Sequence, residues 1–136
     1  VSVHIRRGDY LTPENEKLYG NICTPKYFRA AMREMKRRRP DCHFYLFTND
    51  VEWIRSWDVC GYGEESTIVD TGSGESADYR QFALMAECRH HVLANSSFSW
   101  WASYLHPHED KIVLAPANWL NGWDCADLYR SDMIVI

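Results

Sequence analysis

The sequence contains no run of about eighteen apolar residues, the length that predicts a membrane-spanning helix. It also contains no secretory signal-peptide pattern. The first residue, Val1, is not an initiator methionine, so we interpret the chain as a fragment that lacks an upstream half. Any membrane anchor is expected in that missing N-terminal region.

Several signatures of metal and phosphate sites are also absent. There is no Cys-x-x-Cys pair, so the sequence supports neither a redox couple nor a zinc ribbon. We expect the five cysteines to be reduced structural thiols, with a disulfide as the alternative in a secretory compartment. The six histidines show no ligand spacing, and we predict no metal site. Neither Gly-Lys-Ser/Thr nor a complete Gly-x-Gly-x-x-Gly occurs, which argues against a generic nucleotide or redox protein.

The composition is that of one globular α/β domain. The chain has 136 residues, of which 46% are hydrophobic and 25% charged, enough for one core and no division into two domains. Aromatic residues make up 14%, which suits a protein that stacks rings. The net charge of −4 provides no global attraction for nucleic acid, so we expect no nucleic-acid partner and only local attraction for phosphate.

Strand and helix patterns alternate along the chain, which predicts a parallel sheet with flanking helices. We expect Thr24 to cap a helix that closes at the basic run 37–39, and Asp50 to cap a short one. The stretch around Glu14 is interpreted as a polar loop and the glycine-rich stretch 61–74 as a connection. The predicted strands are 2–5, 43–47, 67–69, 91–94 and 111–115, and two further helices are 77–87 and 98–105.

The first strand runs directly into two adjacent arginines, Arg6 and Arg7. Gly8 then frees the backbone for a tight turn before Asp9. Anionic ligands dock at strand ends of α/β sheets, and an arginine presents a planar array of donors that matches two phosphate oxygens. We predict a diphosphate clamp here; the alternative is a solvated basic turn with each arginine paired to a carboxylate.

A second segment combines a buried strand with a hydroxyl-rich turn and an aromatic helix start, at residues 92–101. Ser96 and Ser97 offer hydroxyl and backbone N–H groups where a helix N-terminus favours an anion, with simple capping as the alternative. Asn95 belongs to an Asn-x-Ser sequon, but its place between a strand and an apolar helix argues against glycosylation. We expect Phe98, Trp100 and Trp101 to pack in the core.

Together the two segments resemble the α-1,2-fucosyltransferase family. His4, Arg6, Arg7 and Asp9 match its motif His-x-Arg-Arg-x-Asp, and residues 88–101 match its late Cys-Lys-His-x-Ile-x-Ala-Asn-Ser-Ser-Phe-Ser-Trp-Trp motif with conservative changes. The similarity also covers 44–50, 111–116 and 127–129, in the same order. It implies a Rossmann-like C-terminal lobe of a GT-B-type enzyme that holds GDP-β-L-fucose and transfers fucose, with inversion, to the 2-hydroxyl of a galactose-terminated glycan.

The resemblance also implies how the reaction proceeds. Relatives are metal-independent, and this sequence lacks the Asp-x-Asp pair that would hold Mg²⁺, so we expect no cofactor and fixed positive charge instead. Arg6 is expected on the β-phosphate, with Arg7 sharing that task or supporting the loop. Glu14 has the family's spacing for a catalytic base, Asp9 is the other candidate, and pairing of Asp9 with an arginine is the favoured alternative.

For the donor, His4 is expected near the nucleotide or orienting the arginines, with a structural histidine as the alternative. Asp50, Asn95, Ser96 and Ser97 are the further expected contacts. Relatives carry an Asp for guanine where this chain has Gln81, and Asp78, one turn earlier, is a possible substitute. This departure keeps open a non-catalytic GDP-sugar-binding module, or a transferase of altered donor specificity. The expected location is at a membrane, in the Golgi lumen of a eukaryote or on the cytoplasmic face in a bacterium.

Overall fold

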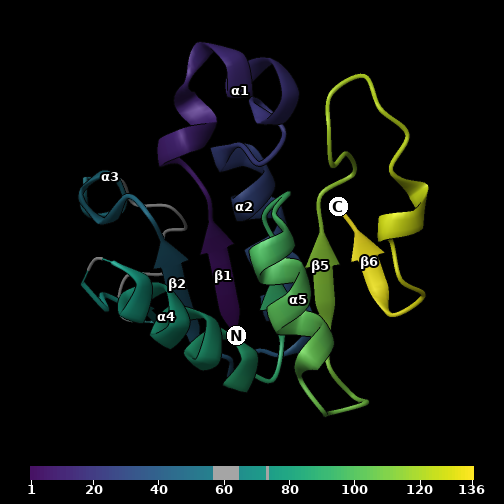
Figure 1. Cartoon of the computed structure of the whole chain (residues 1–136). Helices are drawn as coiled ribbons and strands as arrows, with labels where there is room; N and C mark the ends of the chain where they lie inside the picture. Colours follow the sequence, from purple (N-terminus) through teal and green to yellow (C-terminus); the bar gives the residue numbers. More distant parts are fainter. Residues whose placement is uncertain (57–64, 73) are drawn as a thin grey trace.

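The computed structural model describes residues 1–56, 65–72 and 74–136, and its centre is a six-stranded parallel sheet in the order β3-β2-β1-β4-β5-β6 (Figure 1). The predicted α/β Rossmann-like class is therefore confirmed. The strands are β1 (Ser2–Ile5), β2 (Phe44–Thr48), β3 (Ser66–Ile68), β4 (His91–Val92), β5 (Val113–Ala115) and β6 (Met133–Val135).

Helices cover both faces of the sheet. Val3 and Ile5 of β1 pack against α2, whereas Phe47 of β2 packs against α4 and α5, which lie in front of the sheet in Figure 1. The helices are α1 (Pro13–Tyr19), α2 (Pro25–Arg38), α3 (Val51–Arg55), α4 (Glu75–Glu87) and α5 (Ser97–Leu105), with 3-10 turns η1 (Gly8–Leu11) and η3 (Ala126–Leu128). No helix in the described ranges is long and apolar enough to cross a membrane.

The strand order places the predicted site. From β1 the chain adds β2 and β3 on one side, then returns to add β4, β5 and β6 on the other. The strand order therefore reverses between β1 and β4, and ligands of open α/β sheets bind outside the carboxyl ends of such a pair. The arginine pair follows β1 and the serine-rich turn follows β4, so both segments lie at this switch point.

Local signals explain the helices that the sequence predicted. Thr24 Oγ1 accepts from the backbone N–H of Tyr27 at the start of α2, and Asp50 Oδ1 accepts from that of Trp53 at the start of α3. Helix α2 ends among the basic residues as expected. Both caps satisfy N–H groups that the first helical turn leaves without a partner.

Some predicted boundaries were wrong. Residues 13–19 form a helix and not a polar loop, because Thr12 caps it and Pro13 starts it, although no side chain of α1 is buried to give an apolar period. Strand β6 was not predicted from the sequence. Pairing of β4 covers two residues, and β2 and β3 are offset by one from their expected positions. Residues 61–64 and 73 of the expected connection lie outside the described residues.

Candidate functional site

Arg6 is the first side chain after β1, and it is held by the carboxylate of Asp9, three residues further along the chain in η1. Its Nε lies 2.9 Å from Asp9 Oδ1 and its Nη2 donates to Asp9 Oδ2 at 3.0 Å. This is the two-point pairing that suits a guanidinium. The predicted pairing of Asp9 with an arginine is confirmed. About a third of the Arg6 side chain stays exposed (32%), so the guanidinium is oriented by Asp9 and still open to a ligand.

Arg7 has a different environment from Arg6. Its Nε donates to Asp50 Oδ2 at 3.1 Å, and its guanidinium lies 3.7 Å from the centre of the Trp53 ring. Asp50 uses its other oxygen to cap α3, so both of its carboxylate oxygens are engaged within the protein. The two arginines therefore do not act as one symmetrical clamp in this structure: Arg7 is tied to α3, while Arg6 remains the more available cation.

Asn49 fixes the backbone turn that separates the two arginines from Asp9. Its Oδ1 accepts from the Arg7 backbone N–H at 2.8 Å, and its Nδ2 donates to Asp9 Oδ1 at 3.4 Å. Gly8 has φ +48, and a Cβ there would lie 2.5 Å from Asn49 Nδ2. Glycine is thus required both by the left-handed conformation and by the close approach of Asn49.

Tyr10 connects the segment after β1 with the segment after β4. Its hydroxyl donates to the Asn95 carbonyl oxygen at 2.9 Å and also bonds Ser96, while the Arg6 guanidinium lies 5.8 Å from its ring. Burial is the main cause that raises the pKa of Tyr10 above its ordinary value, so the phenol stays protonated. The ring stacks on Tyr19 at a centroid distance of 4.5 Å.

Asn95 is buried and used for structure. Its Nδ2 donates to the carbonyl oxygens of Tyr19 and Trp119, at 3.2 and 3.1 Å, and its backbone N–H donates to Cys23 Sγ. Only 2% of Asn95 is exposed. The amide nitrogen is therefore inaccessible in the folded protein, which supports the expectation that this sequon is not glycosylated.

The serines after Asn95 form the start of α5. Ser96 is buried and its Oγ accepts from the Phe98 backbone N–H, so the predicted capping role is present. Ser97, the first residue of the helix, is exposed. Of the aromatic residues expected in the core, Phe98 and Trp100 pack against core clusters, but Trp101 is half exposed. Trp101 lies outside the core because Ala102 and Ser99 occupy the face of α5 that meets the sheet.

His4 is almost completely buried beneath this site. It faces α5, with its ring 5.6 Å from that of Phe98, and its Nδ1 has no hydrogen-bond partner in the described part of the chain. Burial, reinforced by the charge of Arg6, lowers the pKa of His4 to about 3. The imidazole is therefore neutral at physiological pH, and it lies at the end of β1 beside the arginines.

A cavity of about 150 Å³ opens beside these groups at the carboxyl end of β1. Its walls come from the turn after β1, from α1 and the following loop, and from Trp53 and Asn95. Glu16 lines it, whereas Glu14 is exposed on the first turn of α1 and does not. The other lining residues that the site uses are Arg6, Arg7, Tyr10, Tyr19 and Cys23.

The two residues predicted for base recognition lie on α4. Gln81 is partly buried and its Nε2 donates to the Thr48 carbonyl oxygen at 3.3 Å, at the end of β2. Asp78 is exposed in the first turn of the helix. The structure therefore brings Gln81, and not Asp78, against the carboxyl edge of the sheet.

Sequence reasoning missed four residues of this site: Asn49, Tyr10, Tyr19 and Trp53. Tyr10 directly follows Asp9, but nothing in the local pattern shows that its hydroxyl reaches Asn95, 85 positions away. Within the described ranges there is no group of three or more metal-ligating side chains. Cys23, Cys42, Cys88 and Cys125 are free thiols, and Cys60 lies outside the described residues.

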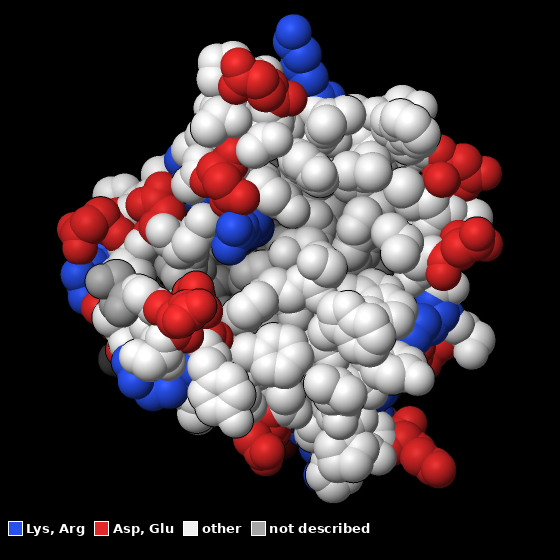
Figure 2. Space-filling view, viewed as in Figure 1, with Lys and Arg blue, Asp and Glu red and all other residues white. Residues whose placement is uncertain are grey.

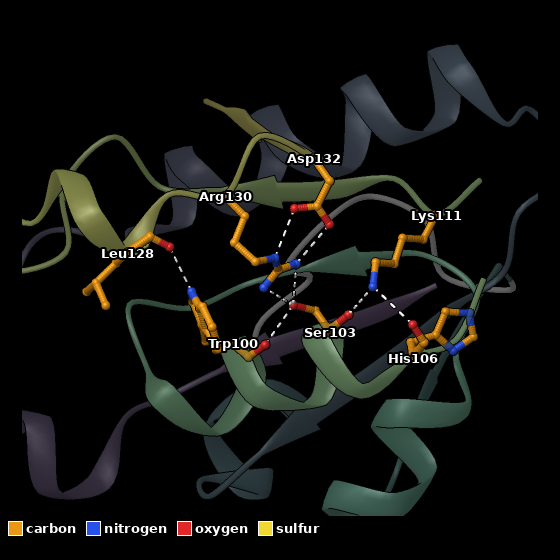
Figure 3. A network of polar contacts seen from close by, with 7 residues as sticks. All are labelled: Trp100, Ser103, His106, Lys111, Leu128, Arg130 and Asp132. Carbon is orange, nitrogen blue, oxygen red and sulfur yellow. Dashed lines mark hydrogen bonds and ion pairs between the residues drawn. The ribbon is translucent and has the colours of Figure 1, made fainter. Parts of the chain in front are cut away.

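A polar network behind α5 holds that helix to the last strand (Figure 3). Arg130 pairs with Asp132 and donates to Ser103 Oγ, and its guanidinium lies 4.9 Å from the centre of the Trp100 ring. Lys111 Nζ donates to the carbonyl oxygens of Ser103 and His106 at the end of the helix. A cation at a helix C-terminus is stabilising, so this network fixes α5, and with it the serine turn.

Comparison with known proteins gives a consistent result. Residues 1–134 match the model of glycosyl transferase family 11. An α-1,2-colitosyltransferase of Escherichia coli is 34% identical over 91% of this chain and 44% of its own length. An O-antigen biosynthesis glycosyltransferase of the same species is 31% identical over 90% of this chain and 39% of its own. Galactoside α-(1,2)-fucosyltransferase 1 of Saimiri sciureus is 33% identical over 77% and 28%. No solved structure matches the chain.

Proposed function

Because the chain belongs to glycosyl transferase family 11, we propose that it is the nucleotide-sugar-binding lobe of an inverting α-1,2-fucosyltransferase. The donor would be GDP-β-L-fucose and the acceptor the 2-hydroxyl of a terminal galactose in a glycan. The chain spans less than half the length of the relatives it matches, so the remaining part of such an enzyme would supply most acceptor contacts. The main support for the proposal is that Arg6 and the serine turn both lie at the switch point, where the Tyr10 hydroxyl joins the two segments through the Asn95 carbonyl oxygen.

The reaction breaks the bond between the anomeric carbon and a β-phosphate oxygen, and GDP leaves with the bonding electrons. Negative charge grows on that oxygen, and fixed donors aimed at it lower the barrier without a metal ion. Arg6 fits this task because it is oriented by Asp9 and partly exposed. The start of α5 adds the positive end of a helix dipole. Arg7 acts as a positioning residue, because its guanidinium already binds the Asp50 carboxylate and stacks on the Trp53 ring.

Inversion requires the acceptor hydroxyl to attack from the face opposite the phosphate and to lose its proton to a base. Glu14 is the base that the family spacing implies, and its exposed position on α1 leaves it accessible to an acceptor held by another part of the enzyme. Asp9 is the weaker candidate because both of its oxygens bind Arg6. Glu16 lines the cavity and is an additional carboxylate at the site.

A donor with a sugar other than fucose is the second candidate. It is favoured by the 34% identical relative that is a colitosyltransferase. Gln81, at the place where relatives carry an Asp for the base, bears on recognition of the guanine and not of the sugar. Gln81 already donates to Thr48, which leaves its Oε1 as one acceptor where a carboxylate would offer two. His4 is paired with Phe47 of β2, so it lies at the same carboxyl edge of the sheet as Thr48, to which Gln81 donates. A GDP-sugar-binding module without transferase activity is the corresponding non-enzymatic candidate.

Calorimetric titration of GDP, without metal, tests the donor site. A charged hydrogen bond is worth about 1.5–3 kcal/mol, so Arg6→Ala should weaken binding about tenfold or more. Arg89→Ala is the matched control, because Arg89 precedes β4 at the opposite edge of the sheet and pairs with Asp110. A folded chain that ignores GDP, or binds it equally well without Arg6, would contradict the assignment. Transfer from fucosyl and colitosyl donors then separates the candidates.

A further inference from the structure

Helix α2 carries an unusual share of the positive charge of this chain. Residues 26–39 hold seven of the fifteen Lys and Arg residues and one acid, Glu34, for a net charge of +6. The whole chain has a net charge of −4, so the other residues together carry −10. The charge is therefore strongly one-sided, and the donor site does not use the α2 cations.

Four of these cations form a row on the outer face of the helix. Lys26, Arg29, Arg33 and Arg37 are all exposed, and their spacing of three and four residues places them on one side of an α-helix. The opposite side is buried against the sheet through Phe28, Met32 and other apolar residues. At about 1.5 Å per residue the row extends over roughly 16 Å.

Two of the four cations in this row, Lys26 and Arg33, have no ion pair within the part of the chain that the structure describes. Arg37 is paired with Glu34, which also binds Arg38 from the side of the helix. Those two arginines lower the pKa of Glu34 to about 2, so it stays charged and offsets part of the potential.

We propose that the outer face of α2, defined by Lys26, Arg29, Arg33 and Arg37, docks the protein on an anionic phospholipid surface. A flat, one-sided row of cations matches a planar layer of phosphate headgroups. The apolar side of α2 is occupied by the core, so the attachment is electrostatic and involves no insertion of the helix. The face over α5, in contrast, shows mainly uncharged side chains at its centre in Figure 2.

Nucleic acid fits this surface less well. Proteins that bind single strands add aromatic platforms on which bases stack, whereas no exposed residue of α2 is aromatic. The charge of −10 on the rest of the chain repels a flexible polyanion that would wrap around it. A planar surface touches only the basic face and avoids that repulsion.

Vesicle co-sedimentation of the whole chain tests the proposal. We expect binding to phosphatidylcholine vesicles with about one third phosphatidylglycerol, none to pure phosphatidylcholine, and loss of binding at about 0.5 M salt. Each cation near the surface is worth about 1 kcal/mol, so the double variant Lys26→Gln, Arg33→Gln should bind about thirtyfold more weakly. Lys17→Gln, Arg80→Gln is the control, with the same change of net charge at exposed sites on α1 and α4.

Both double variants should still bind GDP, so the vesicle test is independent of the test of the donor site. The proposal is overturned if the chain ignores anionic vesicles at low salt, if it binds neutral vesicles equally, or if both double variants lose binding to the same extent. A single-stranded oligouridine that binds more tightly than the vesicles, and that the α2 variant fails to bind, would assign the face to RNA instead.

Discussion

Lowering the pH from about 7 to about 5 should strongly destabilise the folded chain, because His4 and His91 are among the histidines that it buries in the neutral form. His4 and His91 are 3% and 0% exposed, and the pKa of each is lowered to about 3 in the folded protein. Burial is the main cause for both; the charge of Arg6 adds to it at His4, and that of His106 and Lys111 at His91. In the unfolded chain both return to an ordinary pKa of 6.5.

The direction follows from proton binding. Between pH 6.5 and 3 the unfolded chain binds protons that the folded chain excludes, so the stability present above pH 6.5 is lost as the pH falls toward 3. From pH 7 to 5 the loss is about 2 kcal/mol for each histidine, or about 4 kcal/mol for the pair. Domains of this size are stable by about 5–15 kcal/mol, so the effect is a large part of the total.

Urea unfolding followed by tryptophan fluorescence at the two pH values measures this difference. His91→Asn retains a polar atom to bond Ser2 Oγ, which lies 2.8 Å from His91 Nδ1, and it should reduce the loss of stability between pH 7 and 5 by about 2 kcal/mol. His108→Asn, at an exposed position, should leave the dependence unchanged. Equal stability of the wild-type chain at both pH values, or an equal effect of the two variants, would refute the reasoning.

Two substitutions with matched controls test the architecture of the site. Gly8→Ala should lower the free energy of unfolding by about 1–3 kcal/mol and weaken GDP binding, because φ is +48 and the new Cβ would meet Asn49. Gly122→Ala is the control: its φ is +78 and its surroundings are open, so it measures the backbone strain alone. Both variants are measured by urea unfolding and by GDP calorimetry. An equal loss of stability and of GDP affinity in the two would contradict the role given to Asn49. Asn95→Ala should lower the free energy of unfolding by about 1–3 kcal/mol for each of the two buried carbonyl groups left without a donor. Asn121→Ala also loses two bonds to carbonyl groups, but at an exposed position where water replaces them, so it should cost less. A larger loss for Asn121→Ala in urea unfolding would contradict this prediction.

Local sequence patterns were sufficient to predict the architecture and the place of the candidate site. Alternating patterns gave the parallel sheet, and local caps such as Thr24 and Asp50 gave two of the helix starts, because a cap and the N–H it satisfies lie three residues apart. The two segments that resemble the family include residues of β1 and β4 and the turns that follow these strands, and the carboxyl ends of neighbouring parallel strands lie at one edge of the sheet.

Only the tertiary structure decided what each side chain does there. Arg6 and Arg7 are adjacent in sequence, yet one pairs locally with Asp9 while the other is bound by Asp50 and stacked on Trp53, more than forty positions away. Tyr10 reaches Asn95 only after β1 and β4 have paired. Such contacts depend on the strand order, which places distant segments together, and no period or spacing along the chain encodes them.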